Sequence, residues 1–125
     1  MTPIYRDEVR ARISQSELLA QVAEEAAELS LAAMDIAPLE DGFPLAKAAS
    51  RLAHSSLKLR RTLSPENPTP ISTEEAMLKV QEETADVLLC LSVLGIDVAG
   101  PDVALIQKQK LARWVERLEG GQKNA

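Results

Sequence analysis

The chain has 125 residues, which predicts one domain around one core. Hydrophobic residues make up 46% and charged residues 26% of the sequence, so the composition argues against a disordered chain or a fibre. The net charge of −5 and the aromatic content of 2% argue against nucleic-acid binding, which needs cationic surfaces and stacking rings. The single cysteine and the lack of an apolar run of bilayer length predict a cytoplasmic protein with no membrane span.

The N-terminal half of the chain is predicted to contain two helices. A capping box of Ser14 and Glu17 starts the first helix, and an apolar repeat extends it over residues 15–35. Residues 36–43 are expected to form a loop because prolines and a glycine interrupt the repeat. A second helix is expected over residues 44–63, with a proline in its first turn and a proline-rich stretch after its end.

The C-terminal half is predicted to contain two more helices. A capping box of Ser72 and Glu75 opens the third helix, and Gly95 is expected to end it. This third helix is expected to be the core helix. A fourth helix is predicted over residues 101–119, followed by a glycine pair and a frayed tail at residues 120–125. The predicted fold is an all-α, four-helix-bundle-like domain that oligomerisation completes.

Charged residues occupy positions where helical spacing predicts the apolar face. At about 100° per residue, Glu25 falls inside the apolar stripe of the first helix, and Glu28 flanks this stripe. Glu83 falls inside the stripe of the third helix, and Asp86 borders the same edge. Lys110 falls on the apolar face of the last helix. Each of the two acidic helices therefore offers a pair of carboxylates at i, i+3 that can face one point.

A metal site is one explanation for carboxylates on apolar faces. An unpaired buried carboxylate costs several kcal/mol, and a metal ion neutralises several carboxylates at once. Oxygen ligands without histidine or cysteine favour Mg²⁺ or Mn²⁺ over Zn²⁺. The alternative is that these glutamates lie on solvent-exposed helix faces or form ion pairs with lysine or arginine four residues away. For Lys110 the alternative is a lysine stem that lies along apolar surface and keeps its ammonium group in water.

Three motifs, spread over most of the chain, are similar to those of one family. They are Glu24-Glu25-x-x-Glu28, Glu82-Glu83-x-x-Asp86 and Lys110-x-x-Arg113. In these motifs the chain resembles the MazG-like superfamily of all-α nucleoside triphosphate pyrophosphohydrolases. Residues 57–61 and 67–72 are similar to a bacterial and phage-type subgroup of this superfamily. The spacing between the two acidic motifs is longer than usual in the family, which implies an insertion around residues 35–53.

The resemblance implies a reaction, a cofactor and a set of site residues. The reaction is cleavage of a nucleoside triphosphate to the monophosphate and pyrophosphate, with Mg²⁺ or Mn²⁺ as the cofactor. The implied roles are metal binding by Glu25, Glu28, Glu83 and Asp86, orientation or deprotonation of the attacking water by Glu24 or Glu82, neutralisation of the triphosphate by Lys110 and Arg113, and base or sugar contacts by Asn67 and Arg61. The family also implies a homodimer or homotetramer.

Three functions are therefore carried forward from the sequence. The first is a nucleotide pyrophosphohydrolase, for example one that clears aberrant nucleotides from the pool. The second is a non-catalytic helical module that binds a nucleotide or a protein. The third is a phosphoribosyl-ATP pyrophosphohydrolase, a relative with similar size and chemistry.

Overall fold

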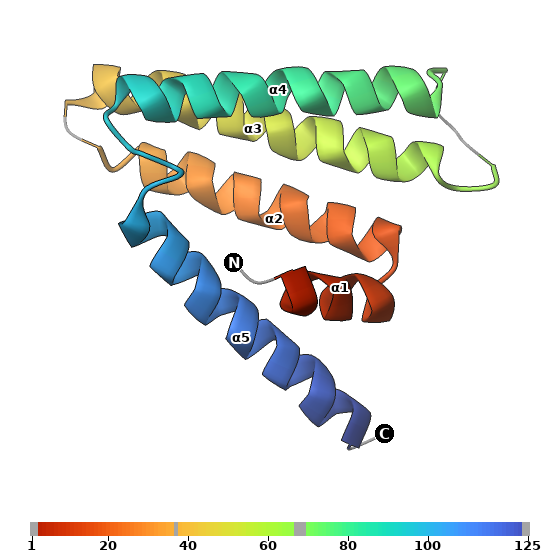
Figure 1. The fold of residues 1–125 in the computed structure, drawn as a ribbon. Helices are drawn as coiled ribbons and strands as arrows, with labels where there is room; N and C mark the ends of the chain where they lie inside the picture. The colour runs from red at the N-terminus through yellow and green to blue at the C-terminus, as the bar shows by residue number, and fades with distance from the viewer. Residues whose placement is uncertain (1–2, 37, 67–69, 124–125) are drawn as a thin grey trace. The chain divides into compact units, whose positions relative to one another are not determined.

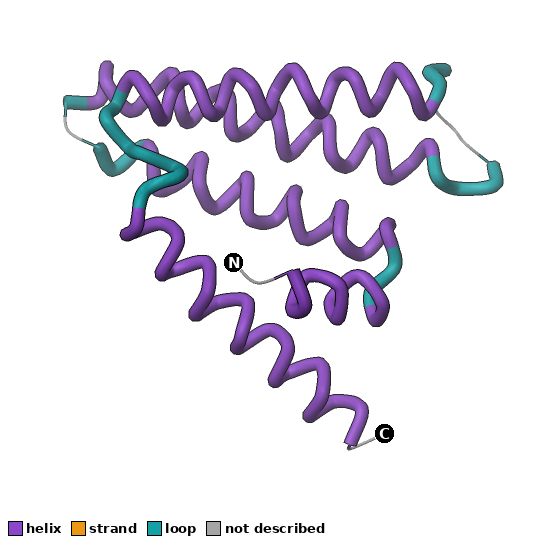
Figure 2. Tube along the Cα trace, viewed as in Figure 1, coloured by secondary structure: helices purple, strands orange, loops and turns teal. Residues whose placement is uncertain are grey.

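The computed structural model describes residues 3–36, 38–66 and 70–123. These residues form five helices, which are α1 (Pro3–Arg12), α2 (Gln15–Ala33), α3 (Leu39–Thr62), α4 (Thr73–Val93) and α5 (Pro101–Lys123) (Figure 1). Figure 2 shows helices joined by loops, and the described residues contain no strand, which confirms the all-α class. None of the described helices combines the length and apolarity needed to cross a lipid bilayer.

The helices group into two compact units, which are described separately. One unit consists of Met1–Gln15 and Asp97–Ala125 and contains α1 and α5. The other consists of Ser16–Ile96 and contains α2, α3 and α4. Four of the five helices correspond to the predicted ones, and α1 is additional.

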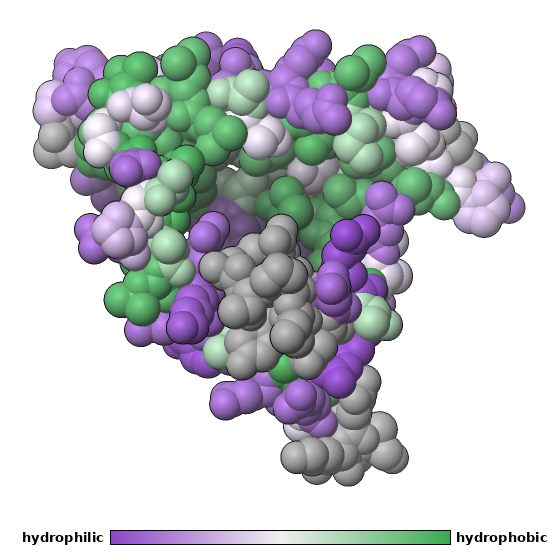
Figure 3. Space-filling model, in the orientation of Figure 1, coloured by the Kyte–Doolittle hydropathy of each residue, from purple (hydrophilic) through white to green (hydrophobic). Residues whose placement is uncertain are grey.

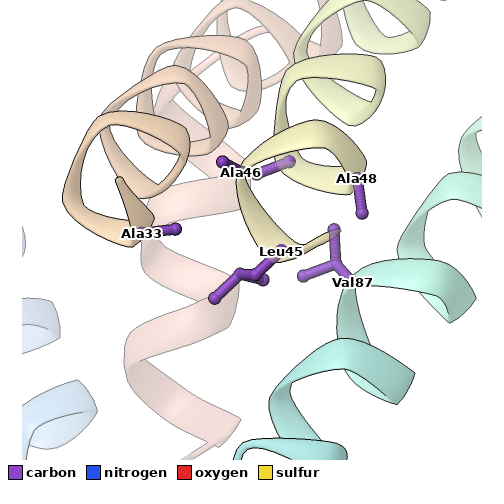
Figure 4. Close-up of a cluster of buried hydrophobic side chains, with 6 residues drawn as sticks. Ala33, Leu45, Ala46, Ala48 and Val87 are labelled. Atoms are coloured by element: carbon purple, nitrogen blue, oxygen red, sulfur yellow. The ribbon is translucent and has the colours of Figure 1, made fainter. Parts of the chain in front are cut away.

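The core of the larger unit is centred on α3, so the expectation that the third predicted helix (α4) forms the core is wrong. Nine residues of α3 are buried, compared with three of α4. The core cluster consists of Ala33 from α2, Val87 from α4 and, from α3, Leu45, Ala46, Ala48 and Ala49 (Figure 4). Alanines dominate this cluster because small side chains let helix backbones approach closely. The partly buried Cys90 packs against the cluster as a small apolar side chain.

The connection between α2 and α3 is shorter than predicted. Helix α3 begins at Leu39, inside the stretch predicted to be a loop, and it contains Pro44 as an interior residue. Gly42 is buried in the first turn of α3 and does not break the helix. A Cβ atom at Gly42 would collide with the carbonyl oxygen of Ala33 and lie 2.9 Å from Cβ of Ile36. Glycine therefore serves here to let the start of α3 approach the end of α2.

Helix α4 begins and ends as the sequence predicts. Ser72 is the N-cap, and its side-chain oxygen accepts a hydrogen bond of 3.1 Å from the backbone N–H of Glu75. After the last turn Gly95 adopts a φ of 83°, a left-handed conformation that favours glycine. The backbone N–H of Ile96 then donates to the carbonyl of Leu91 at 2.9 Å, which completes a Schellman motif.

Apolar side chains of α1 and α5 are buried in the smaller unit. Val9 of α1 is buried, and so are Leu111 and Val115 of α5. Nη1 of Arg12 lies 4.0 Å from Oε1 of Glu119, which adds an ion pair between the two helices. Helix α1 has only ten residues and depends on such packing, since short helices are marginal by themselves.

The predicted end of α5 is wrong. The helix runs through the glycine pair at residues 120–121 and continues to Lys123. A glycine in a helix costs about 1 kcal/mol relative to alanine, which weakens a helix without stopping it. No proline follows the pair, so the chain lacks a strong stop signal at this end.

Candidate functional site

Glu83 is the buried carboxylate of α4. It is 5% exposed, which confirms its predicted place on the buried face of this helix. Nζ of Lys79 lies 3.3 Å from Oε1 of Glu83 and 3.5 Å from Oε2 of Glu82. One ammonium group thus pairs with two neighbouring carboxylates and balances only one of their two negative charges. Asp86, one helical turn after Glu83, is exposed.

The ion pair has a direct effect on Lys79. The hydrogen bond to Glu83 raises the pKa of Lys79 above its ordinary value, and the negative charges of Glu83 and Glu82 add to this effect. The side chain of Lys79 is 57% exposed, so solvent screens the interaction. Lys79 therefore stays positively charged at neutral pH and supplies a cation beside the buried carboxylate.

The acidic residues of α2 do not lie on the buried face. Glu24, Glu25 and Glu28 are exposed, and Oε1 of Glu25 accepts a hydrogen bond of 2.9 Å from Nε2 of Gln21. The prediction that Glu25 lies inside a buried stripe is therefore wrong. The buried residues of α2 are alanines, namely Ala23, Ala26 and Ala33.

A close contact with α3 accompanies this orientation of α2. The hydroxyl of Ser30 donates a hydrogen bond of 2.7 Å to the backbone carbonyl of Ala46. This contact brings the two backbones close together near the end of α2, where Ala33 belongs to the core cluster and Leu29 packs against it. Val22 is 41% exposed, and Glu25 is exposed on the neighbouring edge of the helix.

The four predicted metal ligands are not gathered into one cluster. Among the described residues, no group of three or more histidine, cysteine, aspartate or glutamate side chains is placed to hold a metal ion. Glu83 and Asp86 stand at i, i+3, so they are neighbours on one helix face. Proteins commonly hold Mg²⁺ through one or two carboxylates together with substrate phosphates and water. The donor chemistry of this pair fits a Mg²⁺ ion that arrives with a polyphosphate.

A groove with a volume of about 370 Å³ lies beside Glu83, between α3 and α4. Its lining residues are Ser50, Arg51, His54, Ser55 and Lys58 from α3 with Lys79 and Glu83 from α4. We call it the α3–α4 groove. Three of its side chains are formal cations, and Glu83 is the only carboxylate among them. The groove is thus locally positive in a chain whose net charge is −5.

The sequence prediction missed the α3 wall of this groove. Arg51, His54, Ser55 and Lys58 recur every three or four residues, which places them within an arc of about 100° on one helix face. This polar stripe is visible in the sequence, although nothing local shows that α4 brings Glu83 beside it. The sequence favours a core-edge or surface position for His54 over a ligand role, and the residue is exposed.

The residues predicted to contact the base or sugar lie elsewhere. Arg61 is exposed and lines a second pocket, of about 350 Å³, with Ser16 and Arg60 among its other lining residues. Nε of Arg60 donates a hydrogen bond of 2.9 Å to Oγ of Ser16 across this pocket. Asn67 lies outside the residues that the structure describes.

Lys110 and Arg113 belong to the smaller unit, and both are exposed. The buried face of α5 contains Leu111 and Val115, which lie about 100° and 140° around the helix axis from Lys110. The prediction that Lys110 lies on the buried face is therefore wrong. Packing against α1 selects this face, and the spacing of apolar residues within α5 does not determine it alone.

The function is inferred from these residues themselves. No family model, curated protein or solved structure matches this chain. Three features bear on function: the buried carboxylate of Glu83, its acidic neighbours on α4, and the cationic side chains that line the α3–α4 groove.

Proposed function

We propose that the protein is a Mg²⁺-dependent nucleoside triphosphate pyrophosphohydrolase of the MazG-like type. The observation that carries this proposal is the place of Glu83, a buried carboxylate one turn before Asp86 and beside a cationic groove. Carboxylates bind a hard cation, and nearby cationic side chains neutralise phosphate oxygens, so the combination suits a metal-bound polyphosphate. The resemblance of both acidic motifs to those of the superfamily supports the same reaction.

In the proposed reaction water adds across the anhydride bond between the α- and β-phosphates. The bond breaks, the products are a monophosphate and pyrophosphate, and Glu82 or Glu24 orients the water and accepts its proton. Bound Mg²⁺, or Mn²⁺ in its place, supplies charge neutralisation at the phosphate oxygens. The proposed ligands are Glu83 and Asp86 of α4 with Glu25 and Glu28 of α2. Further proposed substrate contacts are Lys110 and Arg113 to phosphate and Arg61 and Asn67 to base or sugar.

A homodimer or homotetramer belongs to this proposal. Several large apolar side chains of α4 are exposed in the single chain, with Leu78 at 59%, Leu89 at 64% and Val93 at 80%. Figure 3 shows hydrophobic residues gathered over the part of the molecule where Figure 1 draws the C-terminal end of α4. Exposed apolar area of this kind is characteristic of surfaces that a partner covers. The acidic residues of α2 are exposed and thus available to a site that more than one copy builds.

The test is release of pyrophosphate from a panel of standard and modified nucleoside triphosphates and phosphoribosyl-ATP. Each substrate is assayed with Mg²⁺, with Mn²⁺ and with a chelator. We expect metal-dependent release that Glu83→Gln abolishes and that Glu74→Gln, an exposed position on the same helix, preserves. Mg²⁺ should also raise the melting temperature of the wild type and not that of Glu83→Gln.

The panel also separates the three functions. Release from phosphoribosyl-ATP alone would identify the specialised relative. No release from any substrate by a folded protein would refute the hydrolase and leave a helical binding module. Full activity of Glu83→Gln at saturating Mg²⁺ would show that the carboxylate is not part of the site.

A further inference from the structure

We propose that the α3–α4 groove is the binding site for the phosphate chain of the substrate, with Arg51 and Lys58 as its main contacts. This inference rests on the proposed function for the identity of the substrate, a nucleoside triphosphate. The ligand chemistry itself, a linear polyphosphate, follows from the side chains of the groove. Neither acidic motif contains these two residues, and the basic motif at residues 110–114 lies on a different helix.

The charges of the groove are the first argument. Lys79 is already engaged, since its ammonium lies within 3.5 Å of both Glu82 and Glu83. Arg51 and Lys58, by contrast, have no ion-pair partner among the described residues and line the opposite helix of the same groove. Two uncompensated cations in one concave site of an acidic protein are suited to an anionic ligand. Arginine forms bidentate hydrogen bonds to phosphate, and lysine contributes a compact charge.

The shape of the groove is the second argument. Serines at positions 50 and 55 contribute small side chains to its lining, which leaves space that a larger residue would fill. Ser55 is 6% exposed, and its hydroxyl donates to the carbonyl of Arg51 at 2.7 Å, so its polar group is satisfied within α3. The volume of about 370 Å³ is near the lower end of the roughly 300–1,000 Å³ that ligand pockets span. A small ligand such as a triphosphate group is the appropriate size.

The third argument is the position of Glu83 in the same groove. A bare carboxylate would repel phosphate, but Lys79, which also pairs with Glu82, offsets part of this charge. The lining side chains of the groove together still carry more positive than negative charge. A polyphosphate held by Arg51 and Lys58 would lie next to the carboxylate proposed to bind Mg²⁺. The ion and the phosphate oxygens would then meet at the junction of α3 and α4, which gives each helix a separate role. Helix α4 supplies the metal ligands, and α3 supplies the phosphate contacts.

The test measures binding of inorganic triphosphate to the full chain by isothermal titration calorimetry, in the presence of a chelator. This probe carries no base or sugar, and the chelator removes any contribution of the metal ligands. We expect saturable binding to the wild type, weakened by about tenfold in Arg51→Ala and in Lys58→Ala, because each variant loses charge-assisted hydrogen bonds. Lys47→Ala is the matched control, since Lys47 is an exposed cation on the same helix outside the groove.

The outcomes separate this inference from the proposed function. Equal weakening by Arg51→Ala and Lys47→Ala, or no binding to the wild type at millimolar triphosphate, would overturn the groove as the phosphate site. Pyrophosphate release by the wild type tests the proposed hydrolase independently of triphosphate binding. If Arg51→Ala and Lys58→Ala both hydrolyse the substrate with unchanged KM, only the assignment of the groove is refuted. A protein that binds triphosphate in the groove without hydrolysing any nucleotide refutes only the hydrolase. Circular dichroism of each variant shows that its helices are intact.

Discussion

Substitution of Gly42 by alanine tests how the start of α3 packs against the end of α2. The added Cβ atom would collide with the carbonyl oxygen of Ala33 and lie 2.9 Å from Cβ of Ile36. The carbonyl belongs to the backbone of α2 and has no rotamer through which it can move aside. Accommodating the methyl group therefore requires the two helices to separate where the core cluster begins.

The expected effect is the difference between two opposing contributions. Alanine is favoured over glycine inside a helix by about 0.8–1 kcal/mol. Overpacking a close contact costs typically about 1–3 kcal/mol, and a backbone obstacle places the cost in the upper half of this range. We therefore expect Gly42→Ala to lower the free energy of unfolding by about 1–2 kcal/mol.

The assay is urea unfolding followed by circular dichroism. With an m-value of about 1–2 kcal/mol per molar urea, the unfolding midpoint should fall by roughly 1 M. Gly120→Ala is the control, because Gly120 lies in helix α5 and an added Cβ there meets nothing within 4 Å. This control should raise stability by about 0.4–1 kcal/mol. If Gly42→Ala raised the midpoint as Gly120→Ala does, the close approach of α2 and α3 at Gly42 would be refuted.

Two further predictions concern α4. Ser72→Ala removes the N-cap hydrogen bond to Glu75 and should lower the free energy of unfolding by about 1 kcal/mol. The control is Ser92→Ala, at an exposed position on the same helix, which should change the free energy of unfolding by less than about 0.5 kcal/mol. Equal losses in urea unfolding would contradict the assignment of the cap. Lys79→Ala leaves the buried carboxylate of Glu83 without its cation and should lower the midpoint of urea unfolding. Adding Glu83→Gln to this variant should recover part of the loss, because a neutral amide needs no counter-charge. A double variant less stable than Lys79→Ala would refute this account of the ion pair.

Local sequence was sufficient to predict most helix boundaries. The capping box of Ser72 and Glu75 and the stop at Gly95 specify α4 because each signal acts within one helical turn. The burial of Glu83 also followed from helical spacing, since the residues on either side of it in the stripe are apolar. The all-α class followed from apolar repeats at helical spacing and from the lack of stretches that alternate apolar and polar residues.

Tertiary packing decided which faces of the helices are buried and which residues meet. Glu25 was predicted on a buried face and is exposed, whereas the buried residues of α2 are alanines and Ser30 lies against the carbonyl of Ala46. Lys110 is exposed as well, since α5 buries a different face in its unit with α1. Periodicity marks which faces of a helix can be buried. Which of those faces is buried depends on how closely the backbone of another helix can approach, and the periodicity of a single helix contains no information about that helix.

The α3–α4 groove arises in the same way. The polar stripe that contains Arg51 and Lys58 can be read along α3, and the buried carboxylate of Glu83 can be predicted along α4. Their meeting in one groove depends on the packing of the two helices, which small residues such as Ala48 and Ala49 permit. The sequence by itself therefore determined four of the five described helices and the burial of Glu83. Only the tertiary structure placed cations and carboxylate together, because that placement depends on contacts between two different helices, α3 and α4.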